Sequence, residues 1–240
     1  VVFNPDRVPA AHAIAGDLRA EFVIAVRGEV GARPEGTNNA DLDTGAIELL
    51  AGEIQIISAS ETPPFYVNED SPVDENVRLR HRYLDLRRPR QRDNLVLRYR
   101  VIKLMRDYFD AEGFLDIETP ILIKSTPEGA RDFLVPSRLQ PGSFYALPQS
   151  PQQMKQILMI AGLDKYFQIA RCFRDEDPRA DRTSEFTQLD VEMSFIDEED
   201  ILALIERLHV QIIDELSEKR LLSDPFPRLT YAEALDRYGT

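Results

Sequence analysis

Two stretches with alternating side chains, joined by the polar connection DPRADRTS, constrain the fold of this chain more than any other feature. In an extended chain, EFTQLDVEMSF directs one set of residues to one side: Thr187, Leu189, Val191, Met193 and Phe195. The opposite side receives Phe186, Gln188, Asp190 and Glu192. The preceding stretch, YFQIARCFRDED, likewise separates Phe167, Ile169 and Phe173 from Arg174 and Glu176. Antiparallel pairing would bury the apolar sides and leave a charged, open sheet face suited to binding a ligand.

Length and charge limit the class of protein. The chain has 240 residues, 43% of them hydrophobic, which is enough for one large or two smaller domains. A formal net charge of -13 argues against a generally basic coat for nucleic acid, although a local patch remains possible. The single cysteine, Cys172, indicates a reducing compartment, and no long apolar run predicts a membrane span. We expect a cytoplasmic protein without a membrane partner, and a chain that starts inside a domain because it opens on VVF.

The first 66 residues are rich in strand signals. EFVIAVRGEV places Phe22, Ile24 and Val26 on one face, and IELLAGEIQIISA supplies a second extended run after a short helix in PDRVPAAHAIAGDL. The stretch from Ser60 to Asn76 contains several prolines and breaks every periodicity. We therefore predict a first domain at 1–66, a linker or hinge at 67–93 and a second domain at 94–240.

Two amphipathic helices are predicted in the second domain. The first is capped by Asn94, ends at Gly113 and has an apolar stripe that would ordinarily face a core: Leu97, Val101, Leu104, Met105 and Tyr108. A strand, FLDIETPIL, follows and ends near Pro120. The second helix, in DEEDILALIERLHVQIIDELSEKR, is capped by Asp197.

The segment QSPQQMKQILMIAGL predicts a third helix. Ser150 suits the N-cap, Pro151 the first helical position and Gln153 a capping box, with an end near Gly162. Gln152 and Lys155 share a face near the positive helix end and are expected to receive a small anion. The alternative is a surface helix whose lysine is merely solvated.

Arginines gather in RLRHRYLDLRRPRQRDNLVLRYR, within an otherwise acidic chain: Arg78, Arg80, Arg82, Arg87, Arg88, Arg90, Arg92, Arg98 and Arg100. Such a block can follow an RNA phosphate backbone. It can equally pair with carboxylates at a domain seam, and the sequence leaves both possibilities open.

The polar sheet face suits a nucleotide polyphosphate and an amino group. An arginine such as Arg174 can clamp a phosphate, the ring of Phe186 can stack on a base, and Asp190 can hold an ammonium. No GxxxxGK[ST] loop is present, so side chains rather than a backbone cradle would hold the nucleotide. A solvated face of an edge hairpin is the alternative. The three histidines lack ligand spacing, and no metal site is predicted.

Several of these segments also resemble known signatures. FRDED with EFTQLDVE resembles the second motif of class II aminoacyl-tRNA synthetases, and GFLDIETPIL resembles their first, with Pro120 as the motif proline. TPEGARDFLVP with YALPQSPQ is similar to the bacterial aspartyl-tRNA synthetase family. The resemblance runs from about Leu79 to the end of the chain. It implies an α+β fold, with an antiparallel sheet flanked by helices, preceded at 1–66 by part of an OB-fold β-barrel that binds the anticodon.

The resemblance implies roles at both ends of the sheet face. For ATP, Arg174 would contact the α-phosphate, Glu176 would help hold the nucleotide, Phe186 would stack on adenine and Thr183 would contact ATP, although DRTSEF departs from the motif there. Arg174 and Glu176 are therefore the expected catalytic residues.

For L-aspartate, Arg174 would also contact the carboxylate as the adenylate forms, and Glu128 would sense the amino group. Gln152 and Gln188 would flank the amino acid, Asp190 would attract its ammonium, and Lys155 would recognise its side-chain carboxylate.

The implied reaction forms aspartyl-adenylate from aspartate and ATP, normally with Mg²⁺, and then transfers the aspartyl group to tRNA(Asp). The resemblance also implies a homodimer through the first motif. The third motif and most Mg²⁺ ligands have no counterpart in this chain, so we expect it to be inactive alone. Asparaginyl and lysyl relatives are disfavoured by TPEGARD and QSPQ, whereas a non-catalytic RNA-binding or regulatory module stays open as an alternative.

Overall fold

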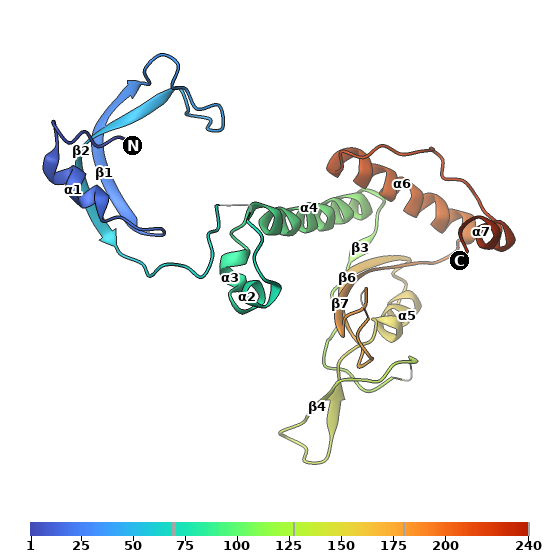
Figure 1. Cartoon of the computed structure of the whole chain (residues 1–240). Helices are drawn as coiled ribbons and strands as arrows, with labels where there is room; N and C mark the ends of the chain where they lie inside the picture. Colours follow the sequence, from blue (N-terminus) through green and yellow to red (C-terminus); the bar gives the residue numbers. More distant parts are fainter. Residues whose placement is uncertain (69–70, 127, 180, 240) are drawn as a thin grey trace. The chain divides into compact units, whose positions relative to one another are not determined.

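The computed structural model describes residues 1–68, 71–126, 128–179 and 181–239. The chain divides into two compact units, Val1–Arg92 and Asp93–Thr240 (Figure 1). The segment expected to be a linker contains two short helices, α2 (Glu75–Arg80) and α3 (Arg82–Asp85), and the start of a third. No helix among the described residues combines the length and apolar character that crossing a membrane requires.

The first unit is built on one antiparallel pair of strands. A short helix, α1 (Pro9–Gly16), precedes β1 (Val23–Ala32) and β2 (Ile47–Ser58). A register shift occurs after Arg27, where a Cβ added to Gly28 would lie 2.2 Å from the carbonyl oxygen of Leu50. Only glycine allows this close approach. The sheet accounts for both predicted strands, while the assignment to an OB-fold stays a prediction.

The second unit is an α+β structure (Figure 1). Its helices are α4 (Pro89–Ala111, which begins in the first unit), α5 (Gln152–Ile160), α6 (Glu198–Leu216) and α7 (Tyr231–Tyr238). Its main sheet has the order β3-β6-β7, from Leu115–Asp116, Lys165–Phe173 and Glu185–Met193. Strands β6 and β7 pair antiparallel over nine residues, and β3 runs parallel to β6. A separate hairpin joins β4 (Leu134–Pro136) and β5 (Phe144–Ala146).

The core lies between the sheet and helices α4 and α6. The fully buried Phe109 stacks on Phe167 of β6, with ring centroids 5.0 Å apart. The hydroxyl of Tyr108 donates to the backbone oxygen of Leu204 at 2.7 Å and thereby joins the two helices. From β7, Leu189 and two other side chains pack against this cluster, namely Val191 and Met193. The prediction that Phe167, Leu189, Val191 and Met193 face the core is therefore confirmed.

Helix α4 begins earlier than predicted. Its first residue is Pro89 rather than one after Asn94, since proline fits the first turn, where its missing N–H leaves no hydrogen bond unmade. The predicted stripe is only partly buried: Leu104 and Tyr108 lie in the core, but Leu97 is 46% exposed. The predicted end is correct, because Gly113 has a φ of +80° that favours glycine.

Four other local predictions are wrong. Strand β6 stops at Phe173, and β3 covers only Leu115–Asp116 instead of extending toward Pro120. Phe195 lies beyond the end of β7, with a φ of +59°, and is 96% exposed rather than packed in the core. Helix α5 starts at Gln152 with Pro151 as its N-cap, and the expected capping box on Gln153 is not formed.

Helix α6 begins as predicted. The carboxylate of Asp197 accepts the N–H groups of Glu199 and Asp200, and the side chain of Asp200 accepts the N–H of Asp197. This reciprocal cap satisfies donors that the first helical turn leaves free.

Candidate active site

The β6–β7 hairpin presents the predicted polar face. Opposite residues in an antiparallel pair share a side of the sheet, and the pairs on this side are Tyr166 with Glu192, Gln168 with Asp190, Ala170 with Gln188, and Cys172 with Phe186. Helix α5 lies against this side, whereas α4 and α6 cover the other (Figure 1). The hairpin thus separates core from site, as alternation predicts.

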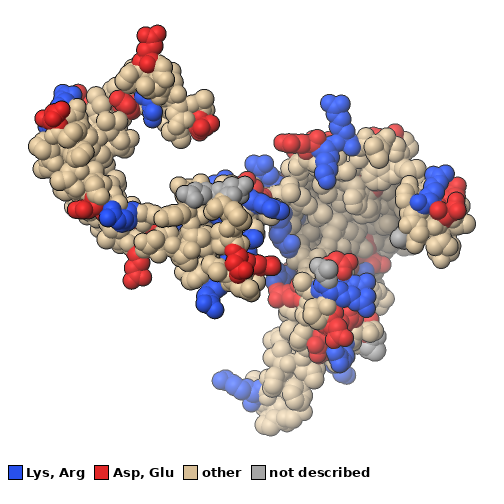
Figure 2. All heavy atoms as spheres, in the orientation of Figure 1, with Lys and Arg blue, Asp and Glu red and all other residues tan. Residues whose placement is uncertain are grey.

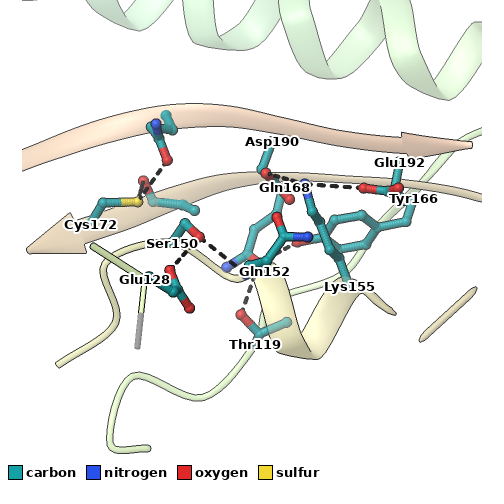
Figure 3. Close-up of polar contacts among 12 residues, drawn as sticks. Thr119, Glu128, Ser150, Gln152, Lys155, Tyr166, Gln168, Cys172, Asp190 and Glu192 are labelled. Atoms are coloured by element: carbon teal, nitrogen blue, oxygen red, sulfur yellow. Dashed lines mark hydrogen bonds and ion pairs between the residues drawn. The ribbon is translucent and has the colours of Figure 1, made fainter. Parts of the chain in front are cut away.

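Lys155 of α5 reaches this face and contacts two carboxylates. Its Nζ lies 3.2 Å from Oδ1 of Asp190 and 3.0 Å from Oε2 of Glu192 (Figure 3). The side chains of Lys155 and Asp190 are only 13% and 12% exposed. One ammonium against two carboxylates leaves this group with a negative charge, which favours an additional cation.

Burial and charge act on these groups in opposite directions. Burial tends to lower the pKa of Lys155, but hydrogen bonds and the charges of Glu192 and Asp190 outweigh it and raise the pKa. Burial raises the pKa of Asp190 above its usual range despite the nearby lysine. The second oxygen of Asp190, Oδ2, is buried and has no hydrogen-bond partner in the described part of the chain. It is therefore placed to accept from a ligand.

A small hydrogen-bond network lies on the same face of the sheet. The hydroxyls of Tyr166 and Thr119 both donate to Oε1 of Gln168, at 2.7 and 3.0 Å (Figure 3). Burial raises the pKa of Tyr166, so its hydroxyl stays protonated and remains a donor. Neither Tyr166 nor Gln168 was among the predicted site residues, although alternation within β6 places both on the polar side.

Glu128 is joined by a hydrogen bond to the segment that starts helix α5. Its two oxygens accept hydroxyl donors, Oε1 from Thr126 at 2.9 Å and Oε2 from Ser150 at 2.8 Å. The hydroxyl of Ser150 therefore interacts mainly with Glu128, and its contact to the N–H of Gln152 is longer, at 3.3 Å. Gln152 stands in the first turn of α5 beside this group (Figure 3).

The thiol of Cys172 orients the side-chain amide of Gln188. Sγ of the buried Cys172 lies 3.2 Å from Oε1 of Gln188. Burial raises the pKa of Cys172 to about 11, so the thiol keeps its proton near neutral pH and can donate it. This contact leaves the amide N–H₂ group of Gln188 available to another acceptor.

The open end of the hairpin forms a cavity of about 410 Å³. Its lining brings together the four residues expected to hold ATP, and it comprises Arg174, Glu176, Asp177, Pro178, Asp181, Arg182, Thr183 and Phe186. The guanidinium carbon of Arg174 lies 5.0 Å from the centre of the Phe186 ring. Nε of Arg174 is buried without a hydrogen-bond partner among the described residues. The hydroxyl of Thr183 is used locally, donating to the backbone oxygen of Glu185 at 2.7 Å.

Several arginines of the block form ion pairs with carboxylates. Arg78 and Arg82 both bind the fully buried Asp85, at 2.9 and 2.6 Å, and Arg87 binds Glu21 at 2.6 Å.

Basic and acidic side chains intermingle around the β6–β7 hairpin rather than forming a field of one sign (Figure 2). Within the residues that the structure describes, no group of three or more histidine, cysteine or acidic side chains is placed to hold a metal ion.

Comparison with known proteins assigns this arrangement to a family. A family model described as tRNA synthetases class II (D, K and N) matches residues 74–240. The chain belongs to this class II synthetase family. The relatives of this class II chain include proteins named aspartate–tRNA(Asp/Asn) ligase from Syntrophomonas wolfei and Rubrobacter xylanophilus, which are 59% and 57% identical over the whole chain. The chain spans about 41% and 40% of their respective lengths.

A solved structure supports the same fold. The crystal structure of a putative aspartyl-tRNA synthetase from Leishmania major Friedlin superimposes with a TM-score of 0.72 at 26% identity, over 85% of this chain and 40% of that one. An antiparallel sheet flanked by helices, as predicted for the class II domain, is thus confirmed.

Proposed function

We propose that this chain carries the amino-acid and ATP sites of an aspartate–tRNA ligase. The observation that carries the proposal is a pair of buried, unpartnered atoms on one hairpin: the acceptor Oδ2 of Asp190 and the donor Nε of Arg174. A ligand with an ammonium at one end and an anion at the other satisfies both. An amino acid activated by ATP has this character, and the names of the relatives support aspartate.

In the proposed first step, aspartate attacks the α-phosphate of ATP and releases pyrophosphate. Arg174 contacts the α-phosphate and the reacting carboxylate and stabilises the charge that develops between them. Phe186 stacks on adenine and Thr183 lines the same cavity, while Glu176 helps to hold the nucleotide. Positioning and charge stabilisation suffice for this step, without a covalent enzyme nucleophile.

The aspartate end of the proposed site is selective by charge. Asp190 and Glu128 receive the ammonium of the substrate, and Gln152 and Gln188 flank it. Lys155 binds the side-chain carboxylate of the substrate, and this group is present in aspartate but absent from asparagine. Because Lys155 already faces two carboxylates, a further cation is required to bind an aspartate side chain tightly.

In the second step, the terminal ribose hydroxyl of a tRNA takes the aspartyl group. We extend the acceptor from tRNA(Asp) to tRNA(Asn), because the relatives are named for both. The β1–β2 unit is proposed as part of an OB-fold that contacts the anticodon. We also propose a cytoplasmic homodimer, formed through the exposed apolar part of α4, which includes Leu95, Leu97 and Tyr99.

Magnesium supplies charge neutralisation to the phosphates of ATP when it is bound. Glu176 and Asp177 are carboxylates in the nucleotide cavity and fit such an ion chemically. They are too few to hold it alone, so the proposal assigns the ion to ATP and not to a site within this chain.

The test is amino-acid-dependent exchange between ATP and pyrophosphate, measured with the whole protein that contains this sequence. We expect exchange with aspartate and none with asparagine or lysine, and loss of exchange in Arg174→Ala. Charging of purified tRNA(Asp) and tRNA(Asn) then tests the acceptor. RNA binding without aspartate-dependent exchange would refute the proposal and favour a non-catalytic module.

A further inference from the structure

Gln149 is a buried amide, and its side-chain hydrogen bonds to described residues all go to the segment 130–132. It is 2% exposed and immediately precedes Ser150. Its Oε1 accepts the N–H of Ala130 at 3.0 Å, and its Nε2 donates to the carbonyl oxygen of Ala130 at 2.9 Å. Nε2 also donates to Oδ1 of Asp132 at 2.6 Å. The side chain therefore pairs with a backbone residue as a neighbouring strand would.

The segment held in this way touches both ends of the site face. Two residues before Ala130, Glu128 accepts the hydroxyl of Ser150. One residue after it, Arg131 pairs with the backbone of Asp175: the N–H of Asp175 donates to the carbonyl oxygen of Arg131 at 3.0 Å, and Nε of Arg131 donates to the carbonyl oxygen of Asp175 at 3.1 Å. Asp175 directly follows Arg174.

We propose that Gln149 is a positioning residue for the proposed aspartate site. By fixing Ala130 and Asp132, it sets the place of Glu128 beside the amino-acid end and of Arg131 beside the nucleotide end. The proposal rests on the proposed function only in the role given to Glu128. The anchoring itself is independent of any substrate.

The substitution Gln149→Glu keeps the size of the side chain and removes both N–H donations. It also places a carboxylate against the carbonyl of Ala130 and the carboxylate of Asp132, which repels the segment. In the whole protein, we expect the KM for aspartate in pyrophosphate exchange to rise about tenfold while kcat stays within about threefold, because ground-state positioning is lost. The control is Gln156→Glu, the same change at an exposed position of α5, and it should behave as the wild type.

A second readout does not depend on catalysis. Arg131 is an exposed trypsin site inside the anchored segment. Brief digestion followed by mass spectrometry should show cleavage after Arg131 about fivefold faster in Gln149→Glu than in the wild type, because cleavage follows local opening. Wild-type rates of cleavage together with a wild-type KM would overturn the proposal.

A double variant separates anchoring from general damage to the fold. In Gln149→Glu with Asp132→Asn, the new amide of residue 132 can donate to the carboxylate at 149, which still accepts the N–H of Ala130. Both the KM and the cleavage rate should return most of the way to wild type. A double variant no better than Gln149→Glu would count against the anchor. If the wild-type protein fails to activate aspartate, the proposed function is refuted, while faster cleavage in Gln149→Glu still supports the anchor.

Discussion

The ammonium of Lys155 lies 3.2 Å from the carboxylate of Asp190, although the two residues are 35 positions apart and belong to a helix and a strand. Both side chains are largely buried, so removing either charge would leave the other buried without its partner, which is unfavourable. The pair thus fixes the contact between α5 and β7 as well as the charge on this part of the sheet face.

Lys155→Met tests this pair. Removing the ammonium leaves Asp190 and Glu192 facing each other, so substrate carboxylates should be repelled. We expect kcat/KM for aspartate in pyrophosphate exchange to fall at least about 100-fold, with less effect on the KM for ATP. Lys219→Met, at an exposed position, is the matched control. Unchanged selectivity for aspartate over asparagine in Lys155→Met would contradict the role given to this lysine.

Phe186→Leu tests the nucleotide end of the face. The change keeps an apolar side chain but removes the ring that lies 5.0 Å from the Arg174 guanidinium. The KM for ATP should rise about tenfold, since stacking and the cation–π contact are both lost. Exposed Phe144 of β5 provides the control Phe144→Leu. An unaltered KM for ATP would show that the ring does not contact the nucleotide.

Asp85→Asn tests the ion pairs of the arginine block. The hydrogen bond from Arg78 lowers the pKa of Asp85, against the effect of burial, and the charges of Arg78 and Arg82 lower it further. A carboxylate with a lowered pKa stabilises the fold above its unfolded pKa, and this contribution is lost as the pH falls through the folded value. At pH 7 the variant should lose about 2 kcal/mol in the free energy of unfolding.

Urea unfolding at several pH values measures this contribution. The difference between wild type and Asp85→Asn should be constant near neutral pH and shrink below the ordinary pKa of 3.8. Asp41→Asn, at an exposed position of the same unit, should show little difference at any pH. A difference that grows in acid would have the wrong sign for this assignment.

Leu97→Glu tests the proposed homodimer. A carboxylate on the exposed apolar part of α4 would be buried without a partner in a dimer. Sedimentation of the whole protein should therefore shift from dimer to monomer at micromolar concentration. Leu139→Glu, at a position 88% exposed between β4 and β5, should leave the mass unchanged. A persistent dimer in Leu97→Glu would place the interface elsewhere.

The sheet face was predictable from sequence because alternation is a local property of an extended chain. Once Leu189 and Val191 are assigned to the core, Gln188 and Asp190 must point the other way. Helix ends were less predictable. Asn94 is a good N-cap, yet Pro89 begins α4, because several nearby residues fit a first turn equally well.

The contacts around Glu128 depend on segments that are distant in sequence but close in space. Ser150 looks like a helix cap in sequence, but Glu128 comes close enough to take its hydroxyl, and Pro151 becomes the cap. Gln149 gives no sequence signal, since its partners lie 17 and 19 residues away along the chain. Such roles follow from tertiary placement, which no local pattern contains.

Because β6 and β7 pair over nine residues, an insertion or deletion has different consequences in strand β7 and in the connection between the two strands. Extra residues in the connection between Arg174 and Glu185 would reshape the nucleotide cavity and leave Asp190 where it is. One extra residue near the start of β7 would turn Asp190 toward Phe109 and expose Leu189 or Val191. Divergent members of the family are therefore free to vary in the length of this connection, whereas the spacing within the strand is fixed.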